Sequence, residues 1–162
     1  MDNQLQDVRE FHRHIGAEIA TKPCLLAHTE TSARQLAEAL REVCDRFADH
    51  PDCQTCLMSR SLMSLEETAE WLEAHADDDI NAAADAWADR LYVLLGDAIA
   101  TGLPASSVFQ AVHTSNMTKA ARDSRTGKGV KASEYQAPEF DVDPSNASLK
   151  PTPASEFLPQ SM

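Results

Sequence analysis

Apolar residues recur every three or four positions along most of this 162-residue chain, a spacing typical of amphipathic helices. The pattern predicts five helices, over about residues 3–20, 31–48, 57–76, 80–101 and 104–121. The boundaries carry residues that cap or stop helices, namely Pro23, the run "DDD" at 77–79, Gly102 and Pro104. We therefore expect an all-α protein, an antiparallel bundle of about five helices.

Each of the first four helices has a stripe of residues that we expect to face the core. In the third helix the stripe has the alternating three-and-four spacing of a packed helical seam. The expected stripes run through Leu5, Val8, Phe11, His12, Ile15 and Ile19; through Leu36, Leu40, Val43 and Phe47; through Leu62, Leu65, Ala69, Leu72 and Ala76; and through Ala84, Ala88, Leu91, Leu95 and Ala98.

The C-terminal part of the chain has a different character. From residue 124 the chain loses its helical period: the stretch "DSRTGKGVKASEYQAPEF" (123–140) has Gly and Lys, and the last residues are rich in Pro and Ser. We divide the chain into a helical domain (1–123), a basic loop that closes on the site (124–140) and an extended or disordered tail (141–162).

Charge is unevenly distributed along the chain. The net charge is −12, yet five of the 14 basic residues fall within 119–131, where they are opposed by a single acidic residue, Asp123. A strongly acidic body argues against a nucleic-acid polymer as partner. The N-terminus is polar and no apolar run approaches the roughly 18 residues of a membrane span, so we expect a cytoplasmic protein without a membrane partner.

Four cysteines, Cys24, Cys44, Cys53 and Cys56, read as cytosolic thiols. The segment "HPDCQTC" holds a CxxC with His50 nearby, which raises the alternative of a zinc site. Because the chain has no second CxxC, a loop with free thiols is the favoured interpretation.

The acidic motif "EETAE" (66–70) gathers Glu66, Glu67 and Glu70 on one flank of the third helix. Asp85 and Asp89 lie one turn apart on the flank of the next helix, so a helical hairpin brings five carboxylates together. Crowded carboxylates repel one another and lose solvation, and a hard divalent cation relieves both effects. Mg²⁺ is therefore the expected cation, with Mn²⁺ as an alternative.

Two other interpretations of the acidic residues are open. Charged runs on helices are commonly solvated faces without a ligand. A ferritin-like di-iron site calls for Glu-x-x-His pairs on two helices, and neither the third nor the fourth helix contains one.

The basic segment has features of a phosphate-binding element. His113, Asn116 and Lys119 step by three, and Lys128 and Lys131 follow in a Gly-containing loop. Asn donates hydrogen bonds and Lys supplies a point charge, both suited to phosphate. The favourable field at a helix C-terminus would explain Lys119 without a ligand, but not the two later lysines.

These residues together resemble the all-α nucleoside triphosphate (NTP) pyrophosphohydrolase superfamily, which includes MazG-like proteins, dimeric dUTPases and phosphoribosyl-ATP pyrophosphohydrolase. "EETAE" matches the EExxE hallmark, and "DAWADRLYVLLGDAIATGLP" is similar to the helix that follows it. "VFQAVHTSNMTKA" resembles the VHxSNMxK segment of one group, "GKGVK" its lysine-bearing loop, and "VREFHRHIG" also fits. The likeness covers about residues 5–140.

The resemblance implies a Mg²⁺-binding helical homodimer or homotetramer. It also implies hydrolysis of an NTP between its α- and β-phosphates, giving a nucleoside monophosphate and pyrophosphate. The roles carried over are metal binding by Glu67, Glu70 and Asp89, water orientation or a second metal at Glu66, and phosphate binding by Asn116 and Lys119, with Lys128 and Lys131 as further candidates.

The chain departs from the family at two places. The common ExxD pattern has a Glu three residues before its Asp, where this chain has Ala86; Asp85, one full turn before Asp89, is the candidate substitute. The stretch between Ala20 and Leu57 also looks longer than usual.

Two rival functions remain at this stage: phosphoribosyl-ATP hydrolysis, and nucleotide binding by a protein with a degenerate metal site. Phe11 and Trp87 are candidates for stacking on a base, although a place in the core is the favoured interpretation for each.

Overall fold

The computed structural model describes residues 1–142, apart from the side chains of Cys53 and Gln54. It contains five α-helices: α1 (Asp2–Ile15), α2 (Glu30–Ala48), α3 (Cys56–Ala76), α4 (Ile80–Thr101) and α5 (Ala105–Asn116). A short 3₁₀ helix, η1 (Pro51–Gln54), precedes α3. The all-α prediction is confirmed; from residue 143 onward the predicted tail lies outside the described residues.

Local capping chemistry sets the helix ends. Asp79 is the N-cap of α4, and its carboxylate accepts hydrogen bonds from the backbone N–H groups of Asn81 and Ala82. Gly102 ends α4 in the left-handed conformation, with φ 70°. Both features were predicted. The first helix, however, ends at Ile15 rather than residue 20, because Gly16 adopts the same left-handed cap.

The predicted end of the fifth helix was also wrong. It stops at Asn116 rather than residue 121, and the following residues form strand β1 (Lys119–Arg122). This strand pairs antiparallel with β2 (Gly129–Lys131), with Lys119 opposite Lys131. A helix through residue 121 would use the backbone groups that this hairpin pairs between strands.

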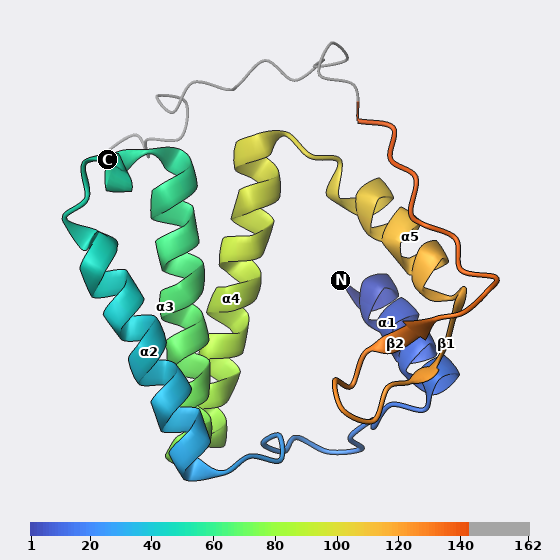
Figure 1. Cartoon of the computed structure of the whole chain (residues 1–162), viewed down its shortest axis with the longest axis horizontal. Helices are drawn as coiled ribbons and strands as arrows, with labels where there is room; N and C mark the ends of the chain where they lie inside the picture. The colour runs from blue at the N-terminus through green and yellow to red at the C-terminus, as the bar shows by residue number, and fades with distance from the viewer. Residues whose placement is uncertain (143–162) are drawn as a thin grey trace, which may run out of the picture.

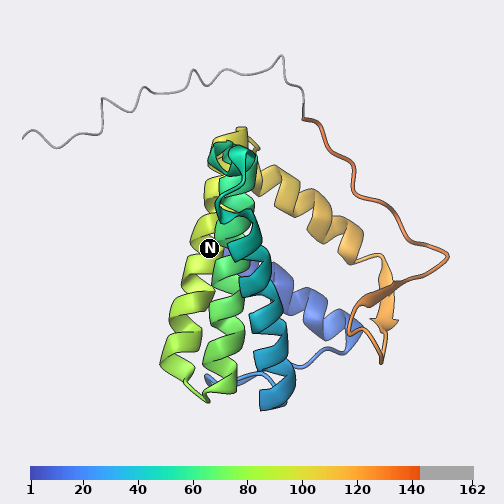
Figure 2. The same ribbon diagram turned by 60° about the vertical axis from the view of Figure 1, so that its left-hand side comes forward.

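The elements form two groups that lie side by side (Figure 1). In one group, α2, α3 and α4 are antiparallel, and α3 packs between the other two. In the other, α1 packs against α5 and against β1. The view turned by 60° also places the hairpin away from α2 and α4 (Figure 2). Residues 16–29 and the turn after α4 connect the groups.

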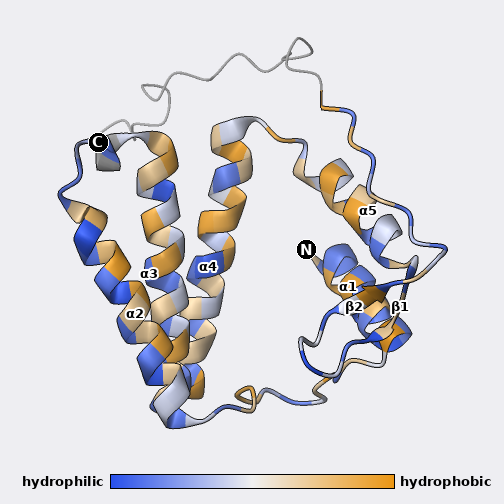
Figure 3. Cartoon of the chain, viewed as in Figure 1, coloured by the Kyte–Doolittle hydropathy of each residue, from blue (hydrophilic) through white to orange (hydrophobic). Residues whose placement is uncertain are grey.

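Alanine dominates the buried positions, while apolar residues occur in both groups of elements (Figure 3). In α3 the predicted seam residues Ala69 and Ala76 are buried. In α4 the seam is shifted from the prediction, because Ala83 and Ala86 are buried whereas Ala84 and Ala88 are exposed. The α2 prediction was shifted likewise: Leu36 is exposed, and the buried residues are Ala33, Ala37 and Cys44.

The prediction for the first turns of α1 was wrong in a similar way. Leu5 and Val8 are 50% and 40% exposed, while Gln4 and Asp7 are half-buried. The face that α1 buries near its N-terminus is therefore polar.

Among the described residues, no single helix is both long and apolar enough to span a membrane, although α4 and α5, bent by 113°, pass that test as a pair.

The alanine seam predicts a sharp sensitivity to side-chain volume. Ala69 is completely buried, so Ala69→Leu forces extra atoms into a closed contact and should destabilise the fold by about 1–3 kcal/mol. Ala39→Leu, on the exposed face of α2, is the matched control and should stay within about 0.5 kcal/mol of the parent. Urea unfolding followed by circular dichroism measures both; equal effects would contradict the seam.

Candidate functional site

Glu67 of α3 is the centre of a group of carboxylates. Burial raises its pKa, and the negative charges of Glu70, Asp89 and Glu66 raise that pKa further. Its Oε2 atom is buried and has no hydrogen-bond partner among the described residues. Two consecutive helices thus bring four of the five predicted carboxylates into one electrostatic group.

The fifth predicted residue, Asp85, has a less central position. It is exposed and lies one turn before Asp89 on α4. The shifted seam accounts for this. At about 100° per residue, Asp85 lies further round the helix from the buried Ala83 and Ala86 than Asp89 does. Ala86 itself is 4% exposed, so a Glu at the family's usual position would be placed in the packed contact of α4.

Arg41 of α2 borders this group and was not predicted as a site residue from the sequence. Its guanidinium donates to both oxygens of Glu73, with Nε–Oε1 and Nη2–Oε2 distances of 3.0 and 2.8 Å. Its Nη2 also lies 3.6 Å from the nearer oxygen of Glu70. One signal was available in the sequence: Arg41 falls between Ala37 and Cys44 on the stripe that α2 buries.

Arg41 divides the acidic flank into a neutralised part and an open part. The bidentate contact lowers the pKa of Glu73 and raises that of Arg41, so this pair is ionised at neutral pH. The positive charge of Arg41 lowers the pKa of Glu67, but this effect is smaller than each of the effects that raise it. The uncompensated negative charge is therefore concentrated at Glu67 and its acidic neighbours.

The residues present fit a divalent cation chemically, because the charges of three carboxylates act on Glu67 and one buried oxygen of Glu67 lacks a partner among the described residues. Their donor atoms are not drawn tightly together. Among the described residues, the group whose ligand atoms all lie within 4.8 Å of one another is Asp7, Glu10 and His113, on α1 and α5. Joint coordination by the α3 and α4 carboxylates therefore requires side-chain rotation, which exposed Glu70 and Asp89 permit.

The predicted phosphate-binding residues surround the start of the hairpin. Lys119 Nζ donates to Asn116 Oδ1 at 2.6 Å and lies 5.9 Å from the centre of the Phe11 ring. His14 Nε2 donates to the Lys119 carbonyl at 2.7 Å. Lys119 and Lys131 face each other across the two strands.

Lys128 lies in the turn of the hairpin and Lys131 at its end, where the Lys131 ammonium sits 4.6 Å from the centre of the Tyr135 ring. The predicted phosphate-binding residues thus lie on the group formed by α1, α5 and the hairpin. The five predicted carboxylates lie on α3 and α4 (Figures 1 and 2). Their joint action on one ligand stays a prediction.

The two aromatic candidates have different surroundings. Phe11 is half-buried beneath Lys119, and its ring approaches Gly129 closely enough that a Cβ there would lie 3.1 Å from it. Trp87 is 46% exposed, so the interpretation of Trp87 as a core residue was wrong. It lines a shallow hollow over α3 and α4 together with Ser64, Thr68, Arg90, Leu91 and Leu94.

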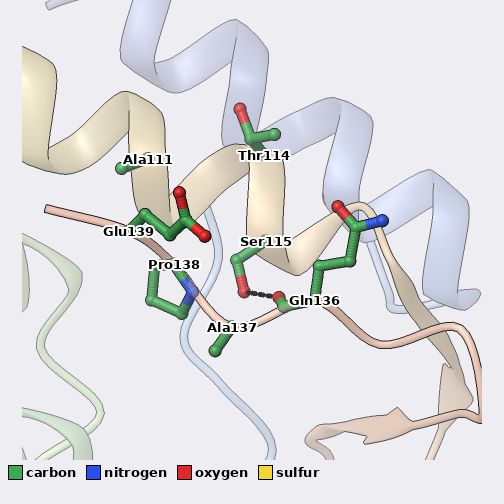
Figure 4. Close-up of a pocket in the computed structure, with 7 residues that line it drawn as sticks. All are labelled: Ala111, Thr114, Ser115, Gln136, Ala137, Pro138 and Glu139. Atoms are coloured by element: carbon green, nitrogen blue, oxygen red, sulfur yellow. Dashed lines mark hydrogen bonds between the residues drawn. The ribbon is translucent and has the colours of Figure 1, made fainter.

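A second hollow lies between α5 and the chain that follows the hairpin (Figure 4). Ser115 Oγ donates to the Gln136 carbonyl at 2.6 Å and holds this segment against the helix. The lining residues are Ala111, Thr114, Ser115, Gln136, Ala137, Pro138 and Glu139. None of them is a predicted site residue, so this hollow is separate from the acidic group.

The raised pKa of Glu67 predicts a pH-dependent effect on stability. The folded protein holds the Glu67 proton more tightly than the unfolded chain, so stability contributed by this group is present below the usual Glu pKa of about 4.3 and is lost as pH rises through the folded pKa. Without divalent cations, Glu67→Gln should therefore unfold at a higher urea concentration than the parent at pH 7, with a smaller difference near pH 4.

Glu38→Gln, an exposed substitution on α2, is the control for loss of one negative charge. Urea titrations in a chelator at several pH values provide the measurement. A Glu67→Gln variant that is less stable than the parent at pH 7 would contradict an uncompensated carboxylate.

Comparison with known proteins identifies the segment that carries the acidic group. Residues 53–116 match the model of the phosphoribosyl-ATP pyrophosphohydrolase family. No curated protein and no solved structure matches the chain. The match includes α3, α4 and α5 with all five predicted carboxylates and Asn116, and confirms the resemblance seen in the sequence. Residues 53–116 are therefore similar to a family within the all-α, MazG-like superfamily of NTP pyrophosphohydrolases.

Proposed function

We propose that the protein is a Mg²⁺-dependent NTP pyrophosphohydrolase that cleaves between the α- and β-phosphates and serves in nucleotide-pool clean-up. The observation that carries this proposal is the carboxylate group around Glu67, within a segment that matches a pyrophosphohydrolase family. The products are a nucleoside monophosphate and pyrophosphate. The proposed place of action is the cytoplasm.

The acidic residues have two roles in this proposal. Glu67, Glu70, Asp85 and Asp89 would hold Mg²⁺, with Mn²⁺ as an alternative ion. When bound, such an ion neutralises phosphate charge and lowers the pKa of a water. Glu66 is exposed beside Glu67, where its carboxylate would orient that water or accept its proton.

The basic residues act on the leaving group. Lys119 and Asn116 are already joined by a hydrogen bond, so the ammonium and the amide are held together before a ligand arrives. They would bind the phosphates that leave as pyrophosphate, and Lys128 and Lys131 would add positive charge from the hairpin. Charge placed where negative charge develops lowers the barrier of the reaction.

A second copy of the chain is part of this proposal. Apolar side chains on α4 stand in solvent, with Tyr92 81%, Ile99 83% and Leu94 63% exposed. Exposed apolar surface of this kind is typical of protein–protein contacts. We propose a homodimer or homotetramer in which the hairpin of one copy reaches the acidic group of another.

Two alternatives have specific support. The family that matches residues 53–116 acts on phosphoribosyl-ATP by its own description, so this compound belongs among the substrates to be tested. A catalytically degenerate nucleotide-binding protein is the second alternative, because Ala86 stands where the superfamily's ExxD pattern has a Glu.

The activity test is incubation with Mg²⁺ and a panel of ribo- and deoxynucleoside triphosphates plus phosphoribosyl-ATP, with products separated by chromatography. We expect monophosphate and pyrophosphate from the parent protein and from Glu38→Gln. Glu67→Gln should lower the rate by at least about 100-fold, since it removes a ligand of the proposed cation. Mg²⁺-dependent thermal stabilisation without turnover would instead favour the degenerate binding protein.

Sharing of the site between copies can be tested by complementation. Glu67→Gln and Lys119→Ala should each be inactive alone, and mixed oligomers of the two variants should recover activity, because some sites then carry neither change. Light scattering gives the oligomer size of each sample. A monomeric active protein, or mixed oligomers as inactive as the single variants, would contradict the shared site.

A further inference from the structure

The face that α1 turns towards its neighbours is unexpectedly polar in its first two turns. Gln4 and Asp7 are half-buried, although Leu5 and Val8 next to them are available and stand largely in solvent. Burying polar groups costs free energy unless they are partnered. Burial of apolar side chains therefore does not explain the orientation of α1 where it packs against α5.

Three potential metal ligands meet where α1 approaches α5. Asp7 and Glu10 are one turn apart on α1, His113 comes from α5, and one ligand atom from each lies within 4.8 Å of the others. Two ligands held about 2.1 Å from one ion are at most about 4.2 Å apart, so small side-chain rotations would close this triangle.

Direct pairing does not account for the cluster. Within residues 1–142, the histidine–carboxylate contacts within 4.0 Å are His28–Asp78 and His50–Asp52. The arginines that pair with carboxylates in the same part of the chain contact residues of α2, α3, α4 and the turn between α3 and α4. Within residues 1–142, Asp7 and Glu10 thus have no cationic nitrogen within 4.0 Å, although their ligand atoms lie within 4.8 Å of His113.

A separate observation comes from Gln4. Its Oε1 atom is buried and has no hydrogen-bond partner among the described residues. Gln4 precedes Asp7 by three residues, so both side chains lie on the same face of α1. An unsatisfied amide oxygen is a ligand that a bound cation, or a water on that cation, would satisfy.

We propose that Asp7, Glu10 and His113 form a binding site for a first-row divalent transition-metal ion, with Gln4 Oε1 as an additional oxygen. Two carboxylates and one imidazole suit Mn²⁺ or Zn²⁺ better than Mg²⁺, which prefers oxygen ligands alone. This site is independent of the proposed activity and of the carboxylates on α3 and α4. A bound ion would join α1 to α5.

The position of the site gives it a structural consequence. One turn further along α1, Phe11 and His14 contact Lys119, and one turn further along α5 lies Asn116, which binds the same lysine. An ion at Asp7, Glu10 and His113 would therefore fix the two helices that hold Lys119 and Asn116.

Mn²⁺ binding followed by electron paramagnetic resonance tests the proposal. Mn²⁺ is the probe because it accepts both carboxylate and imidazole ligands, and excess Mg²⁺ occupies all-oxygen sites without taking the imidazole. In excess Mg²⁺ we expect bound Mn²⁺ whose pulsed spectrum shows coupling to a histidine nitrogen. Glu67→Gln should leave this coupling unchanged, which separates the site from the proposed catalytic one.

Three further variants complete the design. His113→Gln should abolish the nitrogen coupling, and the isosteric Asp7→Asn should weaken Mn²⁺ binding by at least about tenfold, since even outer partners of metal ligands are worth about 10–100-fold. His12→Gln changes a histidine of α1 that is outside the proposed ligand set. It is the control and should keep both the nitrogen coupling and the Mn²⁺ affinity. Circular dichroism verifies that each variant is folded.

The proposal is overturned if the parent protein shows no nitrogen coupling, or if the coupling persists in folded His113→Gln. It is also overturned if Asp7→Asn binds Mn²⁺ as tightly as the parent protein.

Discussion

The partial burial of the Glu67 carboxylate is the constraint on which the rest of the site depends. A carboxylate on an exposed helix face would be solvated, and its neighbours would act on it weakly. Glu67 lies at the edge of the contact between α3 and α4, where burial and three like charges act together on its pKa. Folding places this charge where a cation, a proton or a positive side chain is required nearby.

Arg41 meets that requirement only on one side of the group. Its guanidinium is committed to Glu73 by two hydrogen bonds, and its contact with Glu70 is longer. The predicted phosphate-binding lysines belong to the hairpin, which packs with α1 and not within the α2–α4 stack. The chain thus keeps the carboxylates around Glu67 and the predicted phosphate-binding lysines on separate groups of elements, and for this reason the proposed site is shared between copies.

Much of the architecture follows from local patterns, and the exceptions have identifiable physical causes. Asp79 and Gly102 bound α4 as expected, because caps act on the nearest backbone groups. The hairpin was not predicted, since strand pairing joins residues 7 to 12 positions apart, from Arg122–Gly129 to Lys119–Lys131, whereas the local sequence "MTKAAR" has helical propensity. Arg41 was missed for a similar reason: its partners lie on another helix.

The buried stripes were harder to predict than the helices themselves. The leucines suggested one face for α2 and α4, but the tight contacts formed at Ala33, Ala37, Ala83 and Ala86 instead. Small residues allow two helix axes to approach, and tertiary packing can favour that approach over burial of larger side chains. Asp85 illustrates the result, because a small rotation of α4 about its axis leaves it further from the core than Asp89.

The alanine seam also sets the distance between the two helices that carry the acidic site. The separation of helix axes depends on the side chains at the contact, within a range of about 8–10 Å. Ala69, Ala83 and Ala86 are buried near Glu67 and Asp89, and side chains this small allow the two helices to approach closely. The spacing of the charges across α3 and α4 therefore depends on residues that bear no charge. Selection on the chemistry of this site would then act on the volume of its core, as strictly as on the carboxylates themselves.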